Sequence, residues 1–136
     1  MNLLNEGVNE YYEWLKKRTF VQKDGTTGWS VVSTPFVGLF NDTIDLFVKL
    51  QPNGNVVLSD DGNTLSNLEL LGVNFKSSTG RRDILDRVKL NYGVSVAKDG
   101  EMSKTVVRKD FAQGKHDMIC AILELTKFGN LLIWCG

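Results

Sequence analysis

The sequence is poor in the residues that build disulfide frameworks and metal sites. It has two cysteines and one histidine in 136 residues. Cys120 and Cys135 are too few to form a disulfide framework, and we expect both to stay thiols in a reducing compartment. The single histidine, His116, belongs to no full ligand set with a recognisable zinc-site spacing. A covalently stapled scaffold is therefore excluded.

Charge of one sign is also lacking. Lysine and arginine together number 16, aspartate and glutamate together number 16, and the formal net charge is zero. Such a chain has no long-range field to draw it to nucleic acid or to anionic lipid. The same balance disfavours DNA mimicry by an acidic surface. We therefore expect neither direct nucleic-acid binding nor a membrane partner.

Long apolar runs are absent as well. The stretch "MNLLNEGVNEYYEWLKKRT" has no basic region followed by an uninterrupted apolar segment, so we expect no signal peptide. No later segment is long enough to span a bilayer. A cytoplasmic location follows as an expectation. The length and the 42% hydrophobic content fit one domain with a single core, covering residues 1–136.

The chain opens on a helical pattern. Apolar residues recur at spacings of three and four between Asn5 and Arg18, with acidic residues early and basic residues late. A turn-rich stretch then leads to a β-branched run, which predicts a strand from Trp29 to Ser33 and a second short extended piece.

The strongest hairpin signal lies between residues 43 and 59. "TIDLFVKL" alternates strictly, "QPNG" turns, and "NVVLS" alternates again. Pairing the apolar residues of both strands on one face sets Gln51 opposite Asn55. This register places Asp45 directly across from Asp61, on the face that also carries Phe47 and Lys49. Asp60 then falls on the apolar face, opposite Leu46.

The second half of the chain predicts three helices and another hairpin. Thr64 is the expected N-cap of a helix through Leu71, with Gly72 in the left-handed position after it. The other expected elements are a helix bracketed by Thr79 and Gly93, a hairpin turned at Asp99 and Gly100, and a long helix from Asp110 to Phe128 ended by Gly129. The predicted fold class is α+β, an antiparallel sheet of hairpins packed against about four helices.

The apolar tail after Gly129, "NLLIWCG", predicts either an extra strand along the sheet or pairing with its counterpart in a second chain, and the first is favoured. In this interpretation Trp134 fills a gap beside the first helix.

The pair Asp60 and Asp61 has two interpretations. In the first, Asp60 is structural and accepts amides at the start of the following helix, with Gly62 and Thr64 as turn and cap. In the second, Asp45 and Asp61 repel each other across the hairpin. Such a pair needs Lys49, Arg81, Arg82 or a divalent cation such as Mg²⁺ nearby. A two-metal nuclease would need such a cluster, but the acid and Glu-x-Lys spacing of restriction nucleases is absent.

A second candidate site lies on the long helix. His116 and Cys120 are one turn apart, the helical spacing of two zinc ligands, and Asp117 or Cys135 could complete a set. The alternative is a hydrogen-bonded structural histidine. Nucleophilic catalysis by Cys120 is disfavoured because adjacent turns of one helix rarely align the two groups.

Four segments together resemble a known family. "VVSTPF", "NDTIDLFVKL", "VVLSDDGNTLSNLELLGV" and "GKHDMICAIL" are similar, in order and spacing, to the phage- and bacterium-borne proteins of domain of unknown function 1828, from Tyr11 to about Phe128. The Asp60-Asp61-Gly62 turn followed by Thr64 is the most specific element, and Lys115-His116 is the next. The resemblance implies a compact α+β domain of unassigned biochemistry, often carried on mobile elements, with a further C-terminal module in many members.

Two classes of function remain. The first is a small non-enzymatic binding protein. One form of it is a phage-encoded inhibitor that covers a protein surface of a host defence nuclease, as an anti-CRISPR protein does. This class needs no cofactor. The second is a metal-dependent hydrolase or nuclease that uses Asp45, Asp60, Asp61 and His116 with Mg²⁺ or Zn²⁺. The sequence favours the first class, without a catalytic residue.

Overall fold

A computed structural model describes residues 2–135, and their side chains as far as residue 131. The fold is α+β, as the sequence predicts. The described residues form one six-stranded antiparallel sheet in the order β1-β2-β3-β4-β6-β5. The strands are β1 (Phe20–Lys23), β2 (Ser30–Val37), β3 (Thr43–Leu50), β4 (Asn55–Ser59), β5 (Ser95–Val96) and β6 (Met102–Val107). The α-helices are α1 (Leu3–Lys17), α2 (Asn63–Leu70), α3 (Thr79–Tyr92) and α4 (Phe111–Cys135), and two short 3-10 turns are η1 (Leu39–Asn41) and η2 (Arg108–Asp110).

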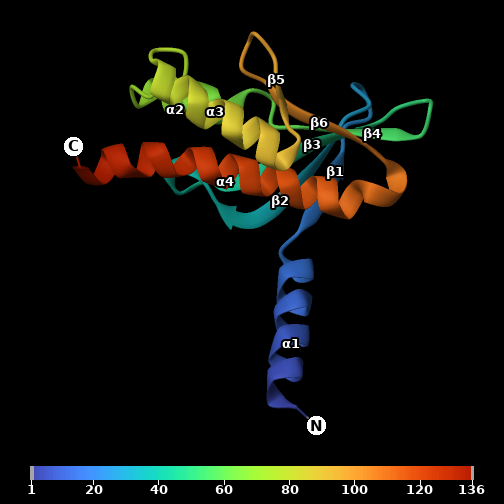
Figure 1. The fold of residues 1–136 in the computed structure, drawn as a ribbon. Helices are drawn as coiled ribbons and strands as arrows, with labels where there is room; N and C mark the ends of the chain where they lie inside the picture. Colours follow the sequence, from blue (N-terminus) through green and yellow to red (C-terminus); the bar gives the residue numbers. More distant parts are fainter. Residues whose placement is uncertain (1, 136) are drawn as a thin grey trace.

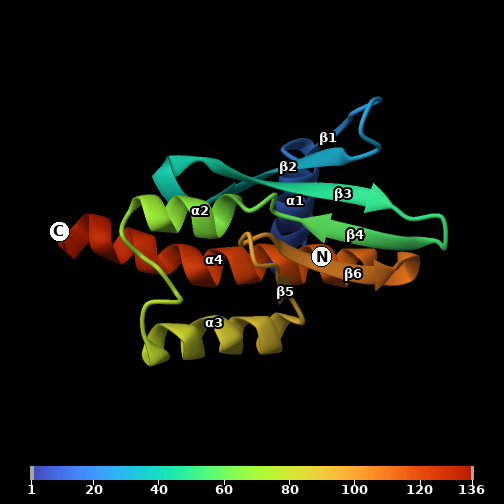
Figure 2. The same cartoon turned by 90° about the horizontal axis from the view of Figure 1, so that it is seen from above.

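Helix α4 covers one face of the sheet, and α2 and α3 pack against α4 (Figure 1). The strict alternation of β3 and β4 sends one set of side chains toward α4, where burial of apolar surface stabilises the fold. The largest fully buried side chains of this core are Leu46, Leu58, Leu68, Met102, Met118 and Leu125. Figure 2 looks onto the opposite face, which these helices leave open.

The predicted register of the first hairpin is confirmed. Val48 pairs with Leu58 and Phe47 pairs with Ser59, which is the alignment that sets Gln51 against Asn55. The second hairpin is confirmed too, because β5 and β6 pair around a turn in which the Gly100 N–H bonds the Ala97 carbonyl.

The C-terminal signals of α2 and α3 are confirmed, but both predicted N-caps are wrong. Gly72 and Gly93 take left-handed conformations after α2 and α3, at φ of 86° and 61°. Thr64 lies within the first turn of α2 and is buried, and the aspartate four residues earlier accepts its N–H. In α3 the side chain of Ser78, not Thr79, accepts the Arg81 N–H.

The expected end of the long helix at Gly129 is wrong. Helix α4 continues without a break to Cys135. A Cβ atom added at Gly129 would meet the side chains of Leu39, Leu68 and Leu71 at 2.5, 2.9 and 3.1 Å. Glycine is therefore present because the helix approaches η1 and α2 closely, not because the helix stops.

The extended tail is wrong for the same reason, since its backbone is helical. The predicted packing of Trp134 and the thiol of Cys135 fall on side chains outside the described residues.

Helix α1 forms where the sequence predicts a helix and points away from the rest of the chain (Figure 1). The Asn2 side chain caps it by accepting the Leu4 N–H at 2.8 Å. None of its side chains is buried. Its chain continues into β1, a strand on the sheet edge that is exposed along its whole length.

Candidate functional site

Asp60 is the most highly connected polar side chain at the junction of β4 and α2. Its Oδ1 accepts the N–H groups of Gly62 and Met102 at 2.8 and 2.9 Å, and its Oδ2 accepts the Thr64 N–H at 3.1 Å. The residue is 2% exposed. Amide donors of this kind satisfy a buried carboxylate, and two of the three come from the start of a helix. The predicted hydrogen bonds of Asp60 to amides at the start of the helix are confirmed.

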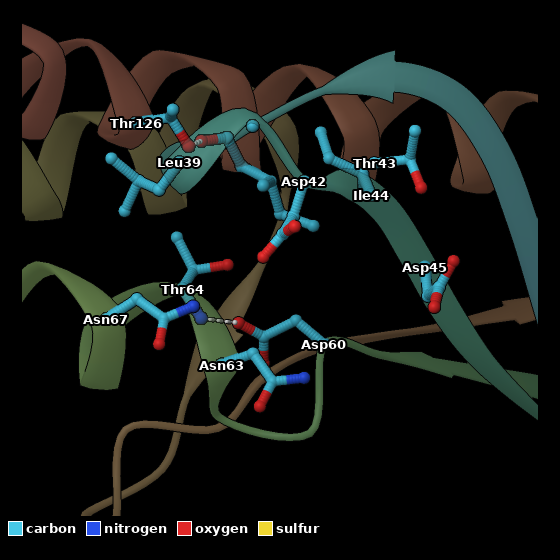
Figure 3. Close-up of a pocket in the computed structure, with 12 residues that line it drawn as sticks. Leu39, Asp42, Thr43, Ile44, Asp45, Asp60, Asn63, Thr64, Asn67 and Thr126 are labelled. Carbon is cyan, nitrogen blue, oxygen red and sulfur yellow. Dashed lines mark hydrogen bonds between the residues drawn. The ribbon is translucent and has the colours of Figure 1, made fainter.

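An acidic cleft of about 370 Å³ lies beside this junction, between η1, β3, α2 and α4 (Figure 3). Three carboxylates line it, from Asp42, Asp45 and Asp60, together with the side chains of Asn63 and Asn67. In Figure 3 the Asp42 carboxylate points toward Asp60, whereas Asp45 stands apart on β3. The cleft is therefore polar and open, with its carboxylates spread along it.

The geometry does not favour this cleft as a metal centre. Within the described part of the chain, no three His, Cys, Asp or Glu side chains converge closely enough to hold a metal ion. The Asp60 oxygens already accept three backbone N–H groups, so a cation there would have to compete with those bonds. Asp60 consequently serves the fold and is a poor ligand.

The expected meeting of Asp45 and Asp61 across the hairpin does not occur. The β3–β4 ladder ends at the pair Phe47 and Ser59. The next residue, Asp60, donates its N–H to the Met102 carbonyl, and Asp61 turns into a left-handed conformation with φ of 58°. Asp45 lines the acidic cleft, and Asp61 lines a different cavity. Asp61 is separated from Asp45 because the turn begins before the ladder reaches them.

His116 and Cys120 do contact each other, with 3.5 Å between Nε2 and Sγ. Burial, and then the charges of Asp117 and Glu124, raise the pKa of the Cys120 thiol. The neutral thiol is a weaker metal ligand and nucleophile than the thiolate. Ile122 lines the acidic cleft. Cys120 lies two residues before it on α4, so the two side chains leave the helix on nearly opposite sides. The pair does not join the aspartates in one site.

The neighbouring Lys115 is half-buried, and burial lowers the pKa of its ammonium group.

A second cavity, of about 290 Å³, lies on the face of the sheet that the helices leave open, and we call it the open-face cavity. Its apolar lining comes from β2, from β3 and from the turn that precedes β2. Its polar lining includes carboxylates on both sides of the rim. The residues that line it are Asp24, Thr27, Trp29, Val31, Phe47, Ser59, Asp61 and Glu101. Val31 and Phe47 are direct partners in the β2–β3 ladder, so they form a continuous apolar strip.

Hydrogen bonds order the acidic rim of the open-face cavity. The Ser59 hydroxyl donates to the Glu101 carboxylate at 2.9 Å and accepts the Asp61 N–H at 3.0 Å. At the other side, Asp24 accepts the N–H and hydroxyl of Thr26, and these bonds lower the pKa of Asp24. Hydrogen bonds thus position the Glu101 and Asp24 carboxylates and the Asp61 backbone around half-buried Trp29 and Phe47.

The alternation of the first hairpin places Asp61 and Phe47 on one face, but no pattern in the sequence marks Trp29, Asp24 or Glu101 as part of a site. The alternation of β3 already sends Phe47 away from the core, and this signal could have marked the open face. Glu101 could not be found in this way, because it reaches the rim only through the pairing of β4 with β6.

The fold and the two cavities define a small α+β domain in which a buried aspartate joins the sheet to a helix. The family model described as Domain of unknown function DUF1828 matches residues 34–125, and the chain belongs to this family. The match runs from β2 into α4 and includes the Asp60 junction, whereas α1 and β1 lie outside it. A search of curated proteins and a search of solved structures found no match to the chain. None of the described helices is both long enough and apolar enough to cross a bilayer.

Proposed function

We propose that this domain is a non-enzymatic binding protein that docks a protein partner on the open face of its sheet. The observation that carries the proposal is the open-face cavity, where Trp29 and Phe47 remain half-buried beside three carboxylates. Aromatic side chains are enriched in protein interfaces because they bury a large area with few rotatable bonds. The ordered acidic rim suits a partner segment that carries basic side chains beside apolar ones.

The same geometry supports a protein that inhibits a nuclease more than it supports a protein that is itself a nuclease. Nucleases bind the phosphate backbone through lysine and arginine, so their working surfaces are basic. An acidic rim beside an apolar strip is complementary to such a surface. Inhibition of a host defence nuclease by a protein carried on a mobile element is the specific form that we propose for this activity.

The metal-dependent hydrolase remains the alternative, with Asp45, Asp60, Asp61 and His116 as its candidate residues. It receives less support because these side chains lie in different places: two in the acidic cleft, one in the open-face cavity and one on α4. Elemental analysis of the purified protein for magnesium and zinc tests this alternative directly. A stoichiometric metal that is lost in Asp45→Asn would favour it.

The binding proposal is tested by affinity capture from a lysate of the host bacterium. Phe47→Ser removes the centre of the apolar strip, and Asp61→Arg reverses one charge of the rim. Asp83→Arg makes the same charge change on an exposed position of α3 and is the matched control. We expect both open-face variants to lose the captured protein and the control to keep it. Equal capture by all four proteins, or capture by none, would contradict the proposal.

The inhibitor form has its own measurement. The captured nuclease should cleave its substrate more slowly when the wild-type protein is added, and Asp61→Arg should not slow it. A captured protein without nuclease activity would reject the inhibitor form and leave the binding function.

A further inference from the structure

Helix α1 carries an apolar face that its own chain does not cover. Leu4, Val8, Tyr11 and Leu15 follow one another at spacings of four and three, so they share one side of the helix. Trp14 extends this side, three residues after Tyr11. Leu4 is 73% exposed, Tyr11 49% and Trp14 44%. An amphipathic helix with this exposure needs a partner, because a helix of 15 residues is marginal when isolated in water.

The aromatic part of this face is already ordered. The rings of Tyr11 and Trp14 stack with 6.2 Å between their centroids, and Tyr12 lies 5.7 Å from Tyr11. The Arg18 guanidinium lies over the Trp14 ring at 4.2 Å. A rigid aromatic surface loses little entropy on binding, which favours its use as an interface.

The charges of α1 indicate which occupant fits. Glu6, Glu10 and Glu13 come first along the helix, and Lys16, Lys17 and Arg18 follow at its end, so the charges cancel. A second copy of the helix in antiparallel orientation sets the acidic part of each helix beside the basic part of the other. A parallel pair would place like charges side by side. A membrane surface fits poorly, because helices that lie on membranes carry an excess of lysine and arginine.

We infer that two copies of this chain associate through an antiparallel pair of α1 helices, with Tyr11 of each copy against Trp14 of the other. Glu10 lies one turn before Trp14 and Lys17 lies about one turn after it, along the same border of the apolar face. In the antiparallel pair, Glu10 of one copy therefore faces Lys17 of its partner, and this ion pair occurs twice. Within one helix the two residues are two turns apart and do not meet.

The area of this contact sets the strength of the dimer. A Tyr or Trp side chain buries roughly 150–250 Å² when fully covered, so the aromatic rings of two partly covered faces, with Leu4 and Val8, remove on the order of 1,000 Å² from water. This is near the lower limit of stable interfaces, about 1,200 Å². We expect a dimer that dissociates on dilution.

The dimer leaves the proposed partner surface free. In Figure 2, which looks onto the open face, α1 lies behind the strands. The dimer and the open-face binding are thus separate properties, and either can fail without the other. Loss of self-association in an α1 variant should leave capture through Phe47 and Asp61 unchanged.

Analytical ultracentrifugation of the full chain over a concentration series tests the dimer. We expect a monomer–dimer equilibrium, with the dimer dissociation constant raised about tenfold or more by Trp14→Ala. Circular dichroism and thermal melting should show the sheet core of this variant intact, because α1 contributes no buried side chain. A monomer at every concentration, or a dimer that Trp14→Ala does not weaken, would overturn the inference.

Charge reversal tests the orientation. Glu10→Lys and Lys17→Glu should each weaken the dimer, since each sets like charges against each other twice, and the double variant should restore it. Glu13→Lys, on the polar side of the helix, is the matched control and should dimerise like wild type. Failure of the double variant to recover would reject the antiparallel register. Binding of a monomer to vesicles of anionic lipid would assign α1 to a membrane instead.

Discussion

The Oδ1 atom of Asp60 accepts the backbone N–H of Met102 at 2.9 Å and thereby ties the end of β4 to the start of β6. The Asp60 N–H in turn donates to the Met102 carbonyl at 3.1 Å. One residue thus continues the sheet ladder with its backbone and begins α2 with its side chain. The aspartate pair of the sequence therefore divides its work, since Asp60 organises the fold and Asp61 reaches the open face.

Asp60→Asn should destabilise the protein by about 1–3 kcal/mol. Asparagine replaces one carboxylate oxygen with an amide NH2 group, so a donor would face the buried Thr64 N–H and that N–H would lose its present acceptor. Chemical denaturation monitored by circular dichroism measures the change.

Asp61→Asn is the matched control, because Asp61 is exposed and asparagine tolerates the same left-handed backbone. It should change the free energy of unfolding by less than about 0.5 kcal/mol. Equal effects of the two substitutions would mean that the carboxylate of Asp60 has no special structural role.

Gly129→Ala should lower stability although alanine favours helices. The added methyl group would enter space held by Leu39 and Leu68, which are both buried and cannot swing into solvent. Overpacking of this kind costs about 1–3 kcal/mol, which exceeds the roughly 1 kcal/mol that alanine adds to helix propensity. Thermal melting measures the loss.

Gly80→Ala in α3 provides the comparison, since a Cβ atom there meets nothing within 4 Å. This variant should be more stable than wild type by roughly 0.5–1 kcal/mol. If Gly129→Ala were stabilised to the same extent, the close approach of α4 to η1 would be absent in solution.

Local signals in the sequence predicted the parts of the fold that depend on neighbours in the chain. The periodicity of α1, the alternation of β3 and β4, and the left-handed glycines after α2 and α3 all act within a few residues. The sequence wrongly predicts a helix end at Gly129. Glycine is needed there because of the close contact with the distant Leu39, which no local pattern reveals. Thr64 is not the N-cap because α2 begins one residue earlier, after left-handed Gly62, and Asp60 accepts the Thr64 N–H. The bond from Asp60 to Met102 spans 42 residues, so no local pattern reveals it.

The candidate site was predictable to the same limited extent. Alternation correctly separated Asp60, on the core side, from Phe47, on the open side. The rim of the open-face cavity was not predictable, because Asp24, Asp61 and Glu101 come from three turns that only the sheet order brings together.

Lys104 should contribute more to stability than an ordinary surface lysine. Its Nζ donates to the Tyr92 carbonyl at 2.6 Å, at the end of α3, and lies 3.4 Å from the Asp117 carboxylate on α4. Both charged side chains are less than one-fifth exposed. Lys104→Met should therefore cost about 1–3 kcal/mol, because it removes the charge partner of Asp117 and the donor to the Tyr92 carbonyl. Urea denaturation provides the measurement.

Lys127 offers the control for this ion pair. It bonds Glu124 at 3.2 Å, but its side chain is 66% exposed, so Lys127→Met should change stability by less than about 1 kcal/mol. The result would contradict the structural role of Lys104 if the two substitutions had the same effect.

The thiol of Cys120 should be unreactive at neutral pH. Burial, and then the Asp117 and Glu124 carboxylates, raise its pKa above the ordinary value of 9.0. The neutral thiol is favoured in the folded state, so the stabilisation from this shift is present below the unfolded pKa and is lost as the pH rises through the folded pKa.

Alkylation by iodoacetamide, followed by peptide mass analysis to separate Cys120 from Cys135, should reach half its maximal rate only above pH 9.0. Glu124→Gln should lower this midpoint, and unfolding in urea should return it to the ordinary value. A midpoint below 9.0 in the folded protein would instead indicate a stabilised thiolate and would reopen the His116 and Cys120 pair as a reactive site.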